Sequence, residues 1–389
     1  MSTERNGAGD GASADLIVVG AGVIGLACAW RAAVEGLNVL VADAGPTERA
    51  SEVAAGMIAP VGEAIWGEGQ LLAAALASAD AWPDFAAELE DAAGCEVPYR
   101  RCGAVHVALD RDEAAELRRR HDLHRELGLR ASWLRAGECR RLEPGLSTSL
   151  CGGFDAPDEA EVDPRSLLAA LRAAAAGAGA RIEEEATAAQ VLLADRAVRG
   201  VRLADGRALE AKRLLVATGA RMGGELIPAE ARPPIRPVKG EILRLRARAG
   251  DRPCERIVVT ERVYVVPRAG DEVVVGATEE DRGFDLRVSA GGVHELLREA
   301  YRVLPEITEL ELIECSAGLR PTTPDNAPVI GATSIGGLLL AGGHHRNGIL
   351  LAPITARAIT AELTGEAPPA AVAGLRPDRF ASLLEGAPA

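Results

Sequence analysis

A glycine-rich turn near the start of the chain has the spacing of a dinucleotide-binding site. The motif GAGVIG at 20–25 fits GxGxxG, and it lies between an apolar run at 16–19 and an Ala-rich, helix-like segment at 21–35. In such a turn the first glycine permits a tight bend, the second lets the backbone approach a pyrophosphate, and the third lets helix and strand pack closely. The N–H groups at the helix N-terminus then face the phosphates. The candidate contacts are Gly20, Gly22, Val23, Ile24 and Gly25.

An acidic residue completes this pattern. Asp43 follows a second apolar run, 39–41, and lies 23 residues after Gly20. Its carboxylate can accept hydrogen bonds from ribose hydroxyls, and it would repel a 2′-phosphate. The alternative is an ordinary Gly-rich turn, but strand, helix, strand and acidic residue are all in register. The sequence therefore predicts dinucleotide binding, although this motif alone does not choose between FAD and NAD.

Two kinds of predicted structure alternate along the chain and would position this turn. Strand–helix units occur at the start, the middle and the end of the chain, and antiparallel strands lie between them. Asp205-Gly206 and the segment 269–271 predict hairpin turns. We therefore expect an α/β fold with two interleaved domains, one of them built on a mainly antiparallel sheet. Further helices are expected at 78–127 (with a strand at 103–108), 164–178, 293–304 and 348–363, and a last strand at 336–341.

Composition limits the classes of partner. The net charge of −14 argues against nucleic acid and anionic membranes, and the 3% aromatic content argues against base stacking. None of the seven cysteines forms a CxxC pair, so no zinc or thioredoxin-like site is expected, and reduced thiols indicate a cytoplasmic protein. Residues 1–14 are small and polar and predict a flexible tail, with no secretion signal and no membrane span.

Several segments together resemble the D-amino-acid oxidase superfamily, and within it the glycine oxidases of thiamine biosynthesis. Besides the N-terminal unit, the resemblance covers nearly the whole chain in the right order. The most specific motifs are AGLRPTTPDNAPVIG and GGHHRNGILLAP. The matching segments are 50–60, 237–243, 264–278, 317–331 and 342–353.

This resemblance implies a fold and a reaction. The fold is an FAD-binding, Rossmann-like domain at 15–85, 150–230 and 317–370, with a substrate domain at 86–149 and 231–316. In the reaction, the α-hydrogen passes as hydride to flavin N5, the imine is released and hydrolysed, and O2 reoxidises the flavin to give H2O2. With glycine, the organic product is glyoxylate, with ammonia.

Two residues match the substrate-binding pair of these oxidases. Arg320 matches the arginine that binds the substrate carboxylate, and a guanidinium fork can hold a carboxylate at two points. Tyr264 matches a tyrosine that helps to hold the same carboxylate. The alternatives are a solvent-facing loop arginine and a core aromatic residue with a satisfied hydroxyl.

Other contacts with FAD follow from the resemblance. The segment 54–57 would run under the isoalloxazine ring, where small residues let the backbone approach, and Ser51 would contact a phosphate or cap a helix. The turn at 343–349 would place a helix N-terminus at the flavin N1–O2 locus; His344 and His345 are expected to be structural rather than general bases. The implied contacts are Ser51, Ala54, Ala55, Gly56, Met57, Ala189, Thr218, Gly219, Gly318, Gly343, His345, Arg346, Asn347, Gly348 and Ile349.

The chain departs from the family pattern at the substrate pocket. Glu279 stands where a known member has a pocket methionine, and Arg262 stands where it has histidine. Glu279 either lines the pocket near the substrate amine or pairs with Arg262 at the rim; Met57 and Arg346 would also line the pocket. Sarcosine oxidases attach FAD to a cysteine at the position of Gly318, whereas Cys315 lies three residues earlier. Non-covalent FAD is therefore expected.

Three alternatives to glycine oxidation stay open. One is an oxidase of secondary amines such as N-substituted glycines, and another is a quinone-linked D-amino-acid dehydrogenase. The third is a flavin-binding subunit without turnover. The expected partners are a small amino acid or amine and O2, and the resemblance also implies a homo-oligomer such as the tetramer that other members form.

Overall fold

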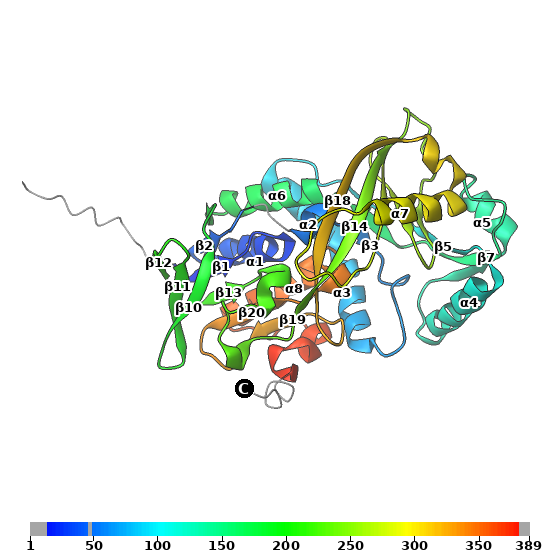
Figure 1. Cartoon of the computed structure of the whole chain (residues 1–389). Helices are drawn as coiled ribbons and strands as arrows, with labels where there is room; N and C mark the ends of the chain where they lie inside the picture. Colours follow the sequence, from blue (N-terminus) through cyan, green and yellow to red (C-terminus); the bar gives the residue numbers. More distant parts are fainter. Residues whose placement is uncertain (1–13, 46–48, 381–389) are drawn as a thin grey trace, which may run out of the picture.

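The computed structural model describes residues 14–45 and 49–380, and its strands form two large sheets (Figure 1). The first sheet has six strands in the order β19-β20-β13-β1-β2-β9. All neighbouring pairs are parallel except β19 and β20, which are antiparallel. Its strands are β1 (Leu16–Val19), β2 (Val39–Ala42), β9 (Arg181–Glu183), β13 (Leu214–Val216), β19 (Val329–Ala332) and β20 (Leu338–Gly342).

The strands of this sheet are apolar on both faces because both faces are covered. Leu16 and Val18 of β1 pack in one core with four helices, whereas Ile17 and Val19 pack in a second core with a three-stranded sheet. The helices are α1 (Val23–Val34), α3 (Gly69–Ala93), α6 (Pro164–Gly177) and α8 (Ala352–Thr364). The small sheet comprises β10 (Ala188–Ala194), β11 (Ala197–Leu203) and β12 (Ala208–Glu210).

The second large sheet has eight strands in the order β18-β14-β17-β16-β15-β5-β7-β6, antiparallel except for the β15–β5 pair. Its two longest strands, β14 and β18, run side by side through the middle of the molecule (Figure 1). The strands are β5 (Ala104–Ala108), β6 (Ser132–Leu134), β7 (Gly152–Ala156), β14 (Arg236–Arg246), β15 (Ile257–Val259), β16 (Tyr264–Pro267), β17 (Glu272–Gly276) and β18 (Glu311–Thr322).

Three further helices accompany the second sheet. Ser289 caps the N-terminus of α7 by accepting from the Gly292 N–H, and Asp110 caps α4 in the same way at Asp112 and Glu113. These helices are α4 (Arg111–Glu126), α5 (Ala136–Leu142) and α7 (Ala290–Val303). The remaining elements are α2 (Ala50–Val53), the strands β3 (Met57–Ile58), β4 (Tyr99–Arg100) and β8 (Ala160–Val162), and 3₁₀ turns at Gly219–Gly223, Ala229–Ala231, Pro305–Glu309, His345–Asn347, Ala370–Leu375 and Pro377–Phe380.

The α/β class with one mainly parallel and one mainly antiparallel sheet confirms the predicted fold. Two of the predicted domain borders need correction where they meet strands. β7 belongs to the eight-stranded sheet because it pairs with β5 and β6, although the border at 150 assigned it to the cofactor domain. β18 crosses the border at 317 without a break because it pairs with β14 along its length.

Two further expectations also differ in detail. The last helix begins at Ala352 rather than Gly348, since Pro353 lacks an N–H and suits a first turn, while His345–Asn347 form a 3₁₀ turn. The predicted tail at 1–14 lies outside the described residues except for Ala14, which forms a β-bridge with Ala211. Within 14–45 and 49–380, no helix has both the length and the apolar character needed to cross a membrane.

Candidate active site

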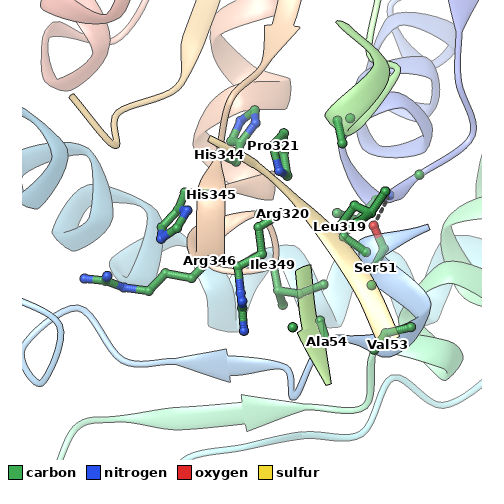
Figure 2. Close-up of a pocket in the computed structure, with 18 of the residues that line it drawn as sticks. Ser51, Val53, Ala54, Leu319, Arg320, Pro321, His344, His345, Arg346 and Ile349 are labelled. Atoms are coloured by element: carbon green, nitrogen blue, oxygen red, sulfur yellow. Dashed lines mark hydrogen bonds between the residues drawn. The ribbon is translucent and has the colours of Figure 1, made fainter. Parts of the chain in front are cut away.

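One cavity of about 750 Å³ is lined by residues from both large sheets. Its volume lies in the range of about 300–1,000 Å³ that ligand pockets occupy. One part of the wall comes from the turn after β1 and the end of β2, and another from β14, β16, β17 and β18. Arg320, Ile349, Ser51 and Ala54 all line this cavity; in Figure 2, Arg320 and Ile349 lie near the centre of the view, with Ala54 and Ser51 to their right.

The glycine turn has the geometry that its spacing predicts. Gly20 has φ +104°, and a Cβ there would lie 2.6 Å from the carbonyl oxygen of Ala217. A Cβ at Gly25 would overlap the Gly20 carbonyl, so this glycine permits close packing of α1 on β1 without lining the cavity itself. Gly22, Val23 and Ile24 line the cavity, and Gly22, the N-cap residue of α1, has no side chain that could cap the helix. The first turn of α1 is therefore available to an anionic ligand.

Two side chains brace this turn. The Ser51 hydroxyl accepts a hydrogen bond from the Val23 N–H at 3.2 Å, drawn as a dashed line in Figure 2. Asp43 is 4% exposed at the end of β2, where its carboxylate accepts from the Ala21 N–H at 3.4 Å and pairs with Arg49. Both residues line the cavity, so the predicted ribose and phosphate contacts lie on one continuous wall.

The chemistry of this wall fits a dinucleotide such as FAD. Thr218 lines the cavity, and its buried hydroxyl has no hydrogen-bond partner among the described residues. A buried polar atom without a partner costs free energy, and a ligand in the cavity can supply the missing partner. Gly219 and Gly318 also line the cavity and leave room for a flat ligand. These features meet the requirements of a site for a bound dinucleotide.

The segment 54–57 is held against the cavity by Arg268, a residue that the sequence did not single out. Arg268 is 3% exposed and donates hydrogen bonds to the carbonyl groups of Ala55 and Val162, the latter at 2.9 Å. It also pairs with the buried carboxylate of Glu161. Since Ala54, Ala55, Gly56 and Met57 all line the cavity, Arg268 fixes the wall that we expect under the ring.

Arg320 and Tyr264 lie together at the other part of the cavity. Arg320 Nη1 donates to the carbonyl groups of Thr278 at 3.1 Å and Lys239 at 3.4 Å. Among the described residues no carboxylate forms an ion pair with Arg320. Burial raises the pKa of Tyr264, and the positive charge of Arg320 is the main opposing influence on this pKa. The site therefore presents a guanidinium and a neutral phenol to a ligand.

A buried ion pair supports the carbonyl groups that hold Arg320. Lys239 and Glu241, at 2% and 0% exposure, lie 2.6 Å apart, and the Glu241 N–H donates to the Thr278 hydroxyl at 2.9 Å. Lys239 and Thr278 each supply one carbonyl to Arg320. The orientation of Arg320 is thus fixed by contacts outside the cavity.

The two histidines after β20 are neutral. The His344 ring is within hydrogen-bond distance of the Thr355 hydroxyl at 2.9 Å, and His345 makes the same contact with Thr322 at 2.8 Å. Burial lowers the pKa of each histidine to about 3. His345, Gly348 and Ile349 line the cavity, and the histidine contacts fit structural roles.

Arg346 is engaged by another side chain. Its Nε lies 2.6 Å from Glu63, whose charge raises the pKa of Arg346, and the side chain extends away from Arg320 in Figure 2. Glu279 and Arg262 both line the cavity and are exposed at its mouth. The structure contains no ion pair between these two described residues, so the rim-pair option for Glu279 has no support.

Three predicted cofactor contacts besides Gly25 lie outside the cavity wall. Gly343 (φ +71°) and Asn347 belong to the turn before α8 but do not line the cavity. Ala189 is exposed, and Ala186, Thr187 and Ala188 line the cavity instead. The physical reason is an irregularity in the β10–β11 pairing between Ala188 and Gln190, which leaves Ala189 out of the ladder.

The chain belongs to a family of FAD-dependent oxidoreductases. The family model described as "FAD dependent oxidoreductase" matches residues 15–362. The cofactor is therefore FAD, and the protein is an enzyme of this oxidoreductase class. The turn at 20–25, the free hydroxyl of Thr218 and the wall at 54–57 are the features of this structure that fit the cofactor.

Similar proteins include glycine oxidases. The chain is 34% identical over 347 residues to the "Bifunctional protein ThiO/ThiG" of Trichormus variabilis, covering 89% of this chain and 52% of the relative. It is 33% identical to the "Glycine oxidase" of Geobacillus kaustophilus, covering 88% of this chain and 90% of the relative. The chain thus spans about half the length of the bifunctional relatives.

Two solved structures of oxidases are also similar to this chain over most of its length. The crystal structure of glycine oxidase from Geobacillus kaustophilus has a TM-score of 0.87 with 31% identity, covering 94% of this chain and 98% of that one. The crystal structure of iminodiacetate oxidase from Chelativorans sp. BNC1 has a TM-score of 0.84 with 28% identity, covering 93% of this chain and 98% of that one.

Proposed function

We propose that this protein oxidises glycine and small D-amino acids or amines, using O2 as the electron acceptor. The observation that carries the proposal is Arg320: a guanidinium without a counter-ion among the described residues, in a cavity that also meets the requirements of FAD. The similarity to glycine oxidases over nearly the whole chain supports the same substrate class.

In this proposal, Arg320 and Tyr264 orient the substrate. The guanidinium binds the α-carboxylate, and the Tyr264 hydroxyl donates a second hydrogen bond to it. This contact holds the Cα–H toward the flavin ring and so replaces a random encounter by a fixed geometry. FAD, when bound, would supply a two-electron oxidant for the hydride of Cα, and O2 would be its electron acceptor. The substrate leaves as an imine, which water hydrolyses to the oxo acid and ammonia.

No protein base is needed for this step. A neutral amine supports hydride loss from Cα, and the low pKa of His344 and His345 keeps both rings uncharged near the site. Their hydrogen bonds to threonine hydroxyls hold the turn that precedes α8. Glu279 at the mouth lies near the substrate amine in this proposal.

A second candidate is an oxidase of N-substituted glycines. The similarity to iminodiacetate oxidase favours it, because that enzyme's name describes a secondary amine with a carboxymethyl group. Two other functions would differ in their products or in what they require of the site. A quinone-linked D-amino-acid dehydrogenase would give no H2O2, and a flavin subunit without turnover would not need an unpaired Arg320.

The deciding experiment is anaerobic mixing of the FAD-loaded protein with glycine while the flavin absorbance is recorded. Bleaching, followed by recovery and H2O2 when air is admitted, is the expected result. Bleaching only with N-substituted glycines or D-amino acids would move the assignment to those substrates. Bleaching without H2O2 would indicate another electron acceptor. If none of these substrates bleached the flavin, the flavin-binding subunit without turnover would be the remaining assignment.

The same proposal extends to the cellular role. The name ThiO/ThiG supports a supply of glyoxylate imine for thiamine thiazole synthesis. In this proposal the enzyme is also cytoplasmic and homo-oligomeric. FAD is non-covalent in this proposal, since Gly318 lines the cavity whereas Cys315 does not. Acid precipitation should release the yellow colour, and sedimentation should give an oligomer.

A further inference from the structure

The cavity includes a lobe that oxidation of glycine does not use. We call it the distal lobe; it is lined by Gly62, Glu63, His106, Glu116 and Arg120. Gly62 and Glu63 follow β3, His106 lies in β5, and the other two lie in α4. These five residues line the same cavity as Arg320 and Tyr264, and the charge of Glu63 raises the pKa of Tyr264. Glycine has no group beyond its amine and carboxylate that could occupy this lobe.

Arg120 is a cation with few contacts in the distal lobe. Its Nη2 donates to the Gly62 carbonyl. Nε is buried without a hydrogen-bond partner, and no contact of Nη1 is found among the described residues. No carboxylate in the described part of the chain forms an ion pair with Arg120. Burial lowers the pKa of Arg120, and the negative charges of Glu63, Glu159 and Glu116 offset this effect only in part.

The carboxylates around Arg120 are engaged by other groups. Glu63 lies 2.6 Å from Arg346, and Glu116 accepts from Arg119 Nε at 2.9 Å. One oxygen of Glu159 accepts from the backbone N–H of Gly62, whereas Oε2 has no hydrogen-bond partner among the described residues and lies 3.7 Å from His106 Nε2. The negative charges of these carboxylates lower the positive potential at Arg120, but they form no hydrogen bonds with its free N–H groups. An anionic group of a ligand can therefore bind to Arg120 and accept hydrogen bonds from its guanidinium.

We propose that Arg120 forms a second anion subsite, so that the preferred substrates are amines with two carboxylates: an α-carboxylate on Arg320 and a distal carboxylate on Arg120. This assignment rests on the proposed function, because it takes Arg320 as the first carboxylate site. The reaction at Cα is unchanged. What the distal lobe adds is selection for a second acidic group.

The test compares pairs of substrates that differ in whether they carry the distal carboxylate. For the FAD-loaded enzyme, kcat/KM is measured for D-glutamate against D-glutamine, and for N-(2-carboxyethyl)glycine against N-propylglycine, with glycine as reference. We expect at least one acidic substrate to be favoured over its neutral partner by about tenfold or more, the size of a charge-assisted hydrogen bond. Arg120→Gln should bring this ratio close to one, and Arg120→Lys should retain part of it.

Arg262→Gln is the matched control, since Arg262 also lines the cavity and makes no ion pair within the described ranges. It should retain the ratio. Loss of the ratio in Arg262→Gln but not in Arg120→Gln would overturn the assignment and place the second anion at the mouth. A ratio near one for both substrate pairs in the parent enzyme would overturn it as well, while turnover of glycine would leave the proposed function intact.

A binding measurement tests the subsite without turnover. Glutarate and butyrate are titrated into the FAD-loaded protein, and the change in flavin absorbance gives each Kd. Tighter binding of glutarate in the parent, lost in Arg120→Gln, supports the subsite even if no amine is oxidised. Equal affinity for the two ligands in the parent contradicts it.

Discussion

The guanidinium of Arg268 hydrogen-bonds the backbone carbonyl of Ala55, 213 residues away in the chain. This contact joins the end of the β16 hairpin strand to the segment 54–57, which lines the cavity. Gly56, with φ +69°, packs its Cα against the Val162 carbonyl, which also accepts from Arg268. The wall at 54–57 is therefore held by one arginine from the other large sheet.

We predict that Arg268→Met destabilises the protein and weakens FAD binding. The substitution leaves the Glu161 carboxylate, 1% exposed, without its strongest partner. Removing one partner of a buried ion pair costs about 3–5 kcal/mol. Thermal unfolding of the FAD-loaded protein measures the loss, and flavin release measures the affinity.

The control for this prediction is Arg246→Gln. Arg246 lies 3.8 Å from Glu311, with side chains 56% and 67% exposed, so its loss should change stability by no more than about 0.5 kcal/mol. Equal Tm values for Arg268→Met and the parent would contradict the role assigned to Arg268.

For Thr218, we predict that removal of the hydroxyl affects the stability of the FAD-free protein and the affinity for FAD in different ways. Because this buried hydroxyl has no partner among the described residues, Thr218→Val should leave the FAD-free protein as stable as the parent or slightly more so. If FAD supplies the missing partner, the Kd for FAD should rise about tenfold. Flavin fluorescence quenching gives the Kd, and denaturant unfolding gives the stability.

Thr355→Val is the matched control for Thr218→Val. The Thr355 hydroxyl lies 2.9 Å from the His344 ring, and both residues are buried. Its removal should destabilise the FAD-free protein by about 1–3 kcal/mol. A Thr218→Val protein with unchanged FAD affinity would show that the hydroxyl faces no group of the cofactor.

Features that depend on short sequence separations could be predicted from the sequence. The glycine turn at 20–25 and the hairpin at 264–276 each form within a few residues, so local spacing and turn chemistry specify them. Arg320 and Tyr264 were assigned through the family motifs, and the structure brings them to the same cavity.

The residues that sequence reasoning missed act across long separations. Arg268 reaches Ala55, Arg120 reaches Gly62 and Glu63 reaches Arg346. Neither Arg268, Arg120 nor Glu63 lies in a pattern that distinguishes it from a solvated surface charge. Only the packing of the two large sheets brings these partners together. For Arg268, the one signal in the sequence is its position directly after a Val-rich strand, and this signal does not distinguish a buried arginine from an exposed one.

Arg320 leads to a prediction about substrate affinity. Arg320→Gln should lower kcat/KM for glycine by about 10- to 100-fold, because a hydrogen bond to a charged group contributes about 1.5–3 kcal/mol. Arg320→Lys should recover part of the loss, since it restores the charge without the fork. Acetate, titrated as a ligand of the FAD-loaded protein, should bind Arg320→Gln more weakly by a similar factor. Unaltered acetate binding would remove Arg320 from the carboxylate site.

The buried histidines predict how stability depends on pH. The pKa of His344 is about 3 in the folded protein and near 6.5 when unfolded, so the unfolded chain binds one more proton between these values. Stability should therefore be highest above pH 6.5 and fall as the pH decreases, by up to about 1.4 kcal/mol per pH unit for one histidine. His344→Gln should flatten the dependence of the unfolding free energy between pH 4 and 6.5, whereas His294→Gln, on the exposed part of α7, should not. Parallel pH curves for His344→Gln and the parent would mean that His344 is protonated in the folded protein.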